Sequence, residues 1–159
     1  MTPTQDDSHV KVVVALEKDE DDYPPADYEN LWAVPVGEGL FRIDNIPFFA
    51  QSIALGDIVA ASPEEGLLRF KGVVQPSGHS TVRLIIYDEP EVPKILEHFN
   101  QLGCESERSH IPGLIALDVP TSISWSVIQR ELEAGHAQAR WDYEEACLGQ
   151  LDEEGALRK

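Results

Sequence analysis

Apolar and polar residues alternate over short runs in the first half of the chain, and turns containing Gly or Pro separate these runs. Successive side chains of a β-strand point to opposite faces, so Phe41 and Ile43 share one face, and Arg42 and Asp44 share the other. The expected strands cover residues 9–16, 31–36, 40–44, 57–61 and 67–75. Five short strands joined by tight turns predict a small β-barrel-like lobe over residues 9–76.

Beyond residue 77, two stretches have the apolar spacing of amphipathic helices. Val92, Ile95 and Phe99 lie on one stripe of a predicted helix over residues 91–102, which Gly103 ends. A second helix is expected over residues 124–134, with Gly135 as its stop. The expected strands of this half cover residues 80–87, 105–109, 114–119 and 137–143. The order β-α-β-β-α-β predicts a ferredoxin-like lobe over residues 77–148 and an α+β fold class, with flexible tails at residues 1–8 and 149–159.

The strand expected at residues 80–87 is apolar on both of its faces, which is typical of a buried strand. A ferredoxin-like sheet has helices on one face only. The opposite face carries Arg83, Ile85 and Tyr87 and therefore needs another cover. We expect the N-terminal lobe to bury this face, with a partner protein or a second copy of the chain as the alternatives.

Length and composition indicate a globular protein. A chain of 159 residues with 42% hydrophobic residues can bury a substantial core. The longest apolar runs are too short to cross a bilayer, and the N-terminus lacks the basic and apolar regions of a signal peptide. We therefore expect a cytoplasmic protein, a monomer or weak homodimer, whose Cys104 and Cys147 are reduced.

Acidic residues dominate the charge, with 29 acidic residues against 12 basic ones and a formal net charge of −17. This charge repels nucleic acids and anionic membranes, so neither is an expected partner. It attracts a basic protein, although solubility alone is the commoner reason for an acidic surface. Thirteen acidic residues lie within residues 17–29 and 142–154. The candidate acidic docking surface consists of Asp19, Glu20, Asp21 and Asp22.

The residues that could carry chemistry form no recognised catalytic or metal-binding motif. A nucleophile elbow is missing, and the five histidines lack the spacing of a helical metal site. The alternative is a hydrolase site that uses His79 and Ser80 with Asp57, but these residues occur where turns lead into strands, and polar residues are expected there anyway. We expect no metal, no cofactor and no catalytic residue.

Four segments of the sequence resemble a bacterial family described only as a domain of unknown function, DUF4265. The resemblance covers roughly residues 10–148 and implies no activity. Its matching segments are Leu31-Trp32-Ala33, Asp44-Asn45-Ile46-Pro47-Phe48-Phe49-Ala50, Gly56-Asp57-Ile58-Val59 and Ser77-Gly78-His79-Ser80-Thr81-Val82-Arg83.

These segments also supply the candidate binding residues. Phe48 and Phe49 are expected to fill the barrel and the seam between the lobes, or else to form a pocket floor or a partner anchor. Arg42 and Arg83 could bind an anion if they converge between the lobes, although ordinary salt bridges are the simpler expectation. The complete candidate set is Arg42, Asn45, Phe49, Asp57, His79 and Arg83.

The sequence therefore favours a non-enzymatic, acidic module that binds another protein. The sharper form of this prediction is an immunity-type inhibitor that caps a basic bacterial toxin, because charge complementarity suits that task. The alternative is a small-ligand-binding protein or an enzyme with a site in the cleft between the lobes, built from Arg42, Arg83, His79 and Asp57.

Overall fold

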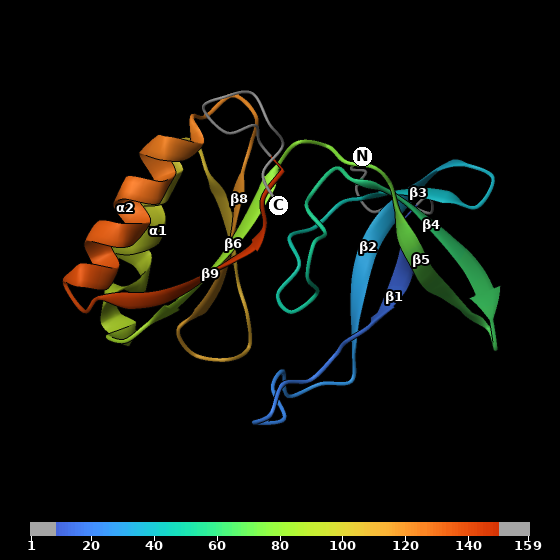
Figure 1. The fold of residues 1–159 in the computed structure, drawn as a ribbon, viewed down its shortest axis with the longest axis horizontal. Helices are drawn as coiled ribbons and strands as arrows, with labels where there is room; N and C mark the ends of the chain where they lie inside the picture. Colours follow the sequence, from blue (N-terminus) through green and yellow to red (C-terminus); the bar gives the residue numbers. More distant parts are fainter. Residues whose placement is uncertain (1–8, 150–159) are drawn as a thin grey trace, which may run out of the picture.

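The structure, a computed structural model, describes residues 9–149 and contains two separate sheets and two α-helices. One sheet closes on itself as a ring of strands, and the other is an open sheet with both helices on one face (Figure 1). We call these halves the strand ring and the helix-backed sheet. Both sheets are mainly antiparallel, so the chain has the α+β class that the sequence predicts.

Five strands form the strand ring, and each pairs with the next in sequence. They are β1 (Val10–Ala15), β2 (Tyr28–Gly37), β3 (Leu40–Ile43), β4 (Ile58–Glu64) and β5 (Leu67–Gln75). A parallel pairing between β5 and β1 closes the ring. The apolar positions of the alternating pattern point inward, where Val12, Leu31, Ile43 and Val59 are fully or almost fully buried. Alternation thus predicts these interior positions, and Ala50 and Ile53, which lie between β3 and β4, complete the same core.

The helix-backed sheet follows in the order β6 (Ser80–Ile86), α1 (Val92–Gln101), β7 (Glu105–Arg108), β8 (Leu114–Val119), α2 (Trp125–Ala137) and β9 (Trp141–Cys147). Its strands lie side by side as β7-β8-β6-β9. The apolar stripes of both helices pack on one face of the sheet, where Phe99, Ile128 and Leu132 are fully buried. The opposite face is turned toward the strand ring (Figure 1).

Two predicted boundaries in this half are wrong, and one contact explains both. Helix α2 continues through Gly135 to Ala137, and β9 begins only at Trp141. Gly135 lies against the ring of Trp141, and a Cβ atom added there would come within 2.0 Å of that ring. Gly135 is therefore a site of close packing inside the helix and not its end signal.

The segment between β3 and β4, residues 44–57, joins the two halves. We call it the connecting segment, and it lies between the sheets in Figure 1. The backbone N–H of Ser52 donates to the carbonyl of Ala146 in β9 at 2.9 Å. The hydroxyl of Thr81 in β6 donates to the carbonyl of Ile53 at 3.1 Å. Backbone groups of the connecting segment thus attach the strand ring to the helix-free face of the sheet.

The cover of that face is only partial, which corrects the prediction from the sequence. Thr81 and Arg83 are buried beneath the connecting segment, with 0% and 4% of their surfaces exposed. Farther along the same face, Ile85 and Tyr87 are 46% and 58% exposed. The prediction that the N-terminal lobe buries these two side chains is wrong, because the connecting segment ends its contact at Arg83.

Candidate functional site

A cavity of about 670 Å³ lies between the strand ring and the helix-backed sheet. Its walls come from the end of β1, from the loop of residues 16–27, from the connecting segment, and from β5, β6 and β9. The volume lies in the range of small-molecule sites. The aromatic lining residues are Tyr23, Phe48, Phe49 and Phe70, and the charged ones are Glu17, Lys18, Asp19, Arg83 and Glu144.

Arg83 projects from β6 into the seam between the halves and forms one side of the cavity. Its Nε donates to Glu144 at 3.2 Å. Its Nη1 donates to the carbonyl of Pro47 at 3.0 Å, and its Nη2 donates to the carbonyl of Phe49 at 3.1 Å. The guanidinium therefore fixes the connecting segment to the sheet, and Glu144 balances its charge.

Lys18, the other cationic lining residue, is also engaged within the protein. Its ammonium donates to the carbonyls of Pro24 and Ala26 at 2.6 and 3.0 Å, and it lies 3.5 Å from a carboxylate oxygen of Asp27. Two hydrogen bonds and one ion pair within the protein thus engage this ammonium. Neither cation of the cavity is thus presented to a ligand as an unpaired charge.

The acidic loop of residues 16–27 has a defined conformation. The acidic, Pro-containing sequence of residues 17–29 predicts a long loop that cannot pack, but Tyr28 and Glu29 belong to β2. Oδ1 of Asp19 accepts hydrogen bonds from the backbone N–H groups of Asp21 and Tyr23, at 2.9 and 3.0 Å. The ring of Tyr23 meets that of Phe49 edge to face, with centroids 6.0 Å apart. The carboxylates of the candidate docking surface, residues 19–22, remain exposed on this ordered loop.

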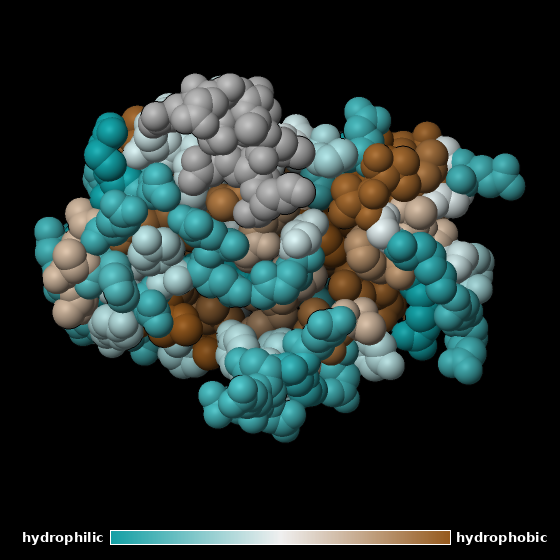
Figure 2. Space-filling view, in the orientation of Figure 1, coloured by the Kyte–Doolittle hydropathy of each residue, from teal (hydrophilic) through white to brown (hydrophobic). Residues whose placement is uncertain are grey.

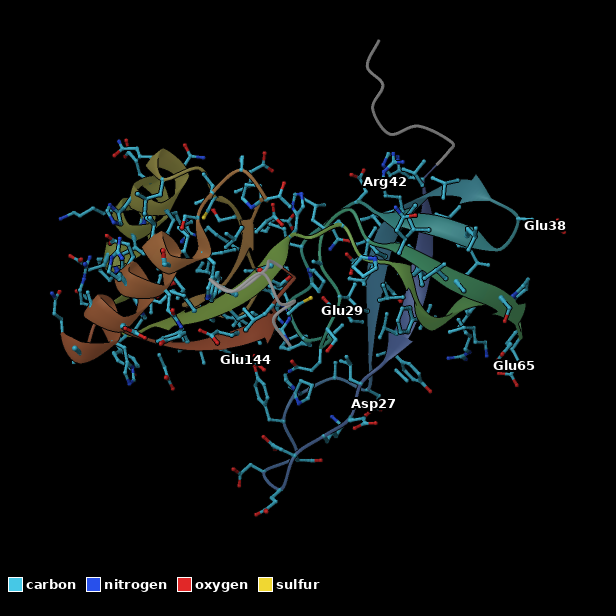
Figure 3. The ribbon with its side chains drawn as sticks, turned by 45° about the horizontal axis from the view of Figure 1, so that its top comes forward. Asp27, Glu29, Glu38, Arg42, Glu65 and Glu144 are labelled. Atoms are coloured by element: carbon cyan, nitrogen blue, oxygen red, sulfur yellow. The ribbon has the colours of Figure 1, made fainter. Side chains whose placement is uncertain are left out.

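Glu29 positions the aromatic wall, a role that the sequence analysis missed. Its carboxylate is buried and accepts hydrogen bonds from the backbone N–H groups of Phe48, Phe49 and Ala50, at 2.6, 3.0 and 2.7 Å. Figure 3 shows it between the two halves. One signal was available in the sequence, because Glu29 lies on the same face of β2 as the buried Leu31 and Ala33.

A smaller hollow of about 110 Å³ adjoins the cavity and shares Tyr23, Arg83 and Glu144 with it. Ile85 and Asp142 also line this hollow, and they face each other across the β6 and β9 pair. Tyr23, Ile85 and Tyr87 are each more than 40% exposed. In Figure 2 the projecting loop at the bottom is hydrophilic, and hydrophobic residues are exposed beside it. We call the exposed Tyr23, Ile85 and Tyr87, with their neighbours Asp142 and Glu144, the open face.

Three of the candidate residues from the sequence stabilise turns. Asn45 accepts a hydrogen bond from the N–H of Trp32 at 2.7 Å. The buried carboxylate of Asp57 accepts from the N–H groups of Ala54 and Ser77, at 3.0 and 2.8 Å. The bond from Ala54 is a local turn bond of the kind that Asp commonly makes, whereas the bonds from Trp32 and Ser77 connect segments 13 and 20 residues apart.

Nδ1 of His79, the third of these turn residues, lies 2.9 Å from a carboxylate oxygen of Asp118 in β8. His79 therefore has Asp118 as its acidic partner and not Asp57. Burial raises the pKa of Asp118 above its usual value, although the hydrogen bond from His79 opposes this effect. The histidine thus holds the turn before β6 against the sheet.

Arg42 and Arg83 do not share a site. Arg42 is exposed on β3 and does not line the cavity. Figure 3 shows it on the strand ring, well away from Glu144, to which Arg83 is bonded. Of the candidate binding residues, the structure brings only Phe49 and Arg83 together in the cavity.

The thiols are unsuited to nucleophilic chemistry. Burial raises the pKa of Cys104 to about 12 and that of Cys147 to about 11, so the reactive thiolate is scarce at neutral pH. Within residues 9–149, no three or more His, Cys, Asp or Glu side chains gather closely enough to hold a metal ion. None of the helices in this part of the chain is long and apolar enough to span a membrane.

Fold and site together define a two-sheet α+β protein with a cavity between its halves. The chain belongs to the family described as a domain of unknown function, DUF4265, whose model matches residues 29–143. Its structure is similar to the crystal structure of a hypothetical protein from Neisseria gonorrhoeae. The two share 26% sequence identity and a TM-score of 0.75, over 87% of this chain and 94% of the other. The comparison with curated proteins gives no match.

Proposed function

We propose that this protein is a binding module that captures a basic protein on the open face. The observation that carries the proposal is the exposure of Tyr23 and Ile85 beside the carboxylates of Asp142 and Glu144, with the exposed Tyr87 two residues beyond Ile85. Aromatic residues within a polar rim are typical of the anchors of protein interfaces.

The charge of the surroundings selects the class of partner. The acidic loop with residues 19–22 projects beside the open face, and the chain carries a net charge of −17. Such a field attracts basic proteins, speeds their association and repels acidic ones. An inhibitor that caps a basic toxin is the specific form of this function that we propose.

We infer that the strand ring, residues 9–76, is a small β-barrel and that residues 77–148 form a ferredoxin-like unit. The connectivity β-α-β-β-α-β and the strand order β7-β8-β6-β9 support the second assignment. In this architecture one sheet face is free of helices, and that face supplies Ile85 to the proposed interface.

A small-ligand site between the halves is the second candidate, and the cavity is the observation that favours it. The residues that the sequence suggested for it are dispersed, because Arg42 lies on the strand ring and His79 and Asp57 stabilise turns. Any site here would use the aromatic wall and the charged residues of the cavity instead.

The test of the proposed function is capture from the native host with matched variants. One variant carries Ile85→Ser and Tyr87→Ser, and another neutralises residues 19–22 as amides. The control carries Glu38→Gln and Glu65→Gln, at the end of the strand ring far from Glu144 (Figure 3). We expect wild type and control to retain the same basic protein in equal amounts, and each of the other two variants to retain less of it.

Two outcomes contradict the proposal. Capture that is equal for all four proteins places the interface elsewhere. A wild-type dimer in sedimentation experiments that Ile85→Ser converts to a monomer assigns the open face to a second copy of this chain.

A further inference from the structure

The cavity between the halves has a charge arrangement that selects one chemical class of ligand. Its two cations are occupied, because Arg83 is bonded to Glu144 and to two carbonyls, and Lys18 is bonded to two carbonyls beside Asp27. Two of the three carboxylates that line the cavity have fewer hydrogen-bond partners. Among the residues that the structure describes, the Glu17 carboxylate has no hydrogen bond or ion pair, and Asp19 uses only Oδ1.

The remaining walls are aromatic. Tyr23 and Phe49 meet edge to face on one side, and Phe48 and Phe70 complete the lining. The face of an aromatic ring attracts an ammonium or guanidinium group, and this attraction strengthens where water is partly excluded. Burial is the main reason that the pKa of Tyr23 is raised, and the nearby carboxylates of Glu144 and Asp19 raise it further, whereas Arg83 lowers it.

We propose that the cavity binds an organic cation, that is, an alkylammonium or guanidinium group whose carbon chain lies against the aromatic wall and whose charge faces Glu17 and Asp19. Glu17, Asp19 and Glu144 repel an anion, and neither cation of the cavity is unpaired and able to bind it. A neutral ligand of the same shape lacks the Coulomb attraction and the cation–π contact.

Two sources can supply this group. It can be a free organic cation, or it can be a Lys or Arg side chain of a basic protein held on the adjoining open face. The cavity and the open face share Tyr23, Arg83 and Glu144, so a partner bound there lies next to the cavity mouth. The second source rests on the proposed function, and the first does not.

The experiment titrates the full chain with three probes of matched size, namely pentylammonium, 1-pentanol and pentanoate, and follows amide signals by NMR. We expect pentylammonium to shift the signals of Leu16, Phe49 and Gln51, all of which line the cavity. Its affinity should exceed that of 1-pentanol about tenfold. Pentanoate should leave these signals unchanged.

Matched variants test which carboxylate of the protein faces the bound cation. Glu17→Gln should weaken pentylammonium binding about fivefold, because one carboxylate facing the cation becomes neutral. Glu38→Gln, at the end of the strand ring far from Glu144 and outside the cavity lining, should leave it unchanged (Figure 3). Phe48→Leu should weaken binding of the cation more than that of 1-pentanol, because it removes a ring face and keeps an apolar side chain. Both glutamates are exposed, so their amide variants are expected to fold.

The inference is overturned if 1-pentanol binds as tightly as pentylammonium, if the two amide variants behave alike, or if the shifted signals lie outside the cavity. When the cation binds as expected, the source follows from competition. Loss of the captured basic protein at saturating pentylammonium assigns the site to a partner side chain, and unchanged capture assigns it to a free cation. Cation binding without any captured protein leaves this inference standing and removes the proposed function.

Discussion

Among the residues between the two halves, we expect Arg83 to contribute most to holding the halves together. We expect Arg83→Met to lower the free energy of unfolding by about 3 kcal/mol, because it leaves the carbonyls of Pro47 and Phe49 without donors and Glu144 without its cation. Urea unfolding measures this change. The matched variant Arg42→Met alters an exposed strand arginine and should cost less than about 0.5 kcal/mol. Equal costs for the two variants would contradict the role of Arg83.

Asp118 gives a second prediction at this scale, because burial raises its pKa in the folded protein. A carboxyl with a raised folded pKa binds its proton more tightly in the folded state. Its contribution to stability is therefore fully present below the unfolded pKa of about 3.8 and is lost as pH rises through the raised folded value. We expect the difference in unfolding free energy between wild type and Asp118→Asn to fall with rising pH over this window, by at most about 1.4 kcal/mol per pH unit. Urea unfolding at several pH values tests this, and a difference that is constant or rises would refute it.

The packing of α2 on β9 determines where the helix ends. The helix continues past Gly135, which the local sequence suggests as its end. An ordinary Gly→Ala change within a helix stabilises it by about 1 kcal/mol. Gly135→Ala should instead destabilise the protein by about 2 kcal/mol, because the added methyl group meets the ring of Trp141. Thermal or urea unfolding measures the sign. In a Trp141→Phe background the smaller ring should remove most of this cost, and a cost unchanged by that background would mean that the contact is not its cause.

Helices and strands with a clear hydrophobic period were predictable from the sequence, whereas contacts between residues far apart in the sequence were not. Short apolar runs between Gly- and Pro-containing turns located every strand of the ring, although β2 begins three residues before its expected start at residue 31. The apolar stripe located α1 together with the Gly103 that ends it. Sequence could not reveal that Gly135 accommodates Trp141, or that Asp118 is the partner of His79, because each pair forms only after the chain folds back. Phe49 and Arg83, two of the candidate binding residues, line the cavity between the halves. Their neighbours Lys18, Tyr23 and Glu29 lie in the sequence segment that was expected to be only an acidic loop.

At the scale of the whole molecule, the two halves leave an open face beside a strongly acidic loop, and these two features should act on different steps of binding. Exposed charges at an interface rim act mainly on the encounter, whereas buried apolar anchors determine how long the complex lasts. For a captured basic protein, neutralising residues 19–22 should therefore reduce the association rate. The Ile85→Ser and Tyr87→Ser pair should increase the dissociation rate instead.

Measuring both rates by surface plasmon resonance at two salt concentrations separates these contributions. Salt at about 1 M shortens the screening length to about 3 Å, so it should abolish the difference in association rate between wild type and the neutralised loop variant. It should leave the faster dissociation of the Ile85→Ser and Tyr87→Ser pair almost unchanged, because that pair loses apolar contact and not charge. A loop variant that dissociates faster at both salt concentrations, with its association rate unchanged, would show that the acidic loop is itself a packed part of the interface. Rates equal to wild type in both variants would exclude both surfaces from the contact.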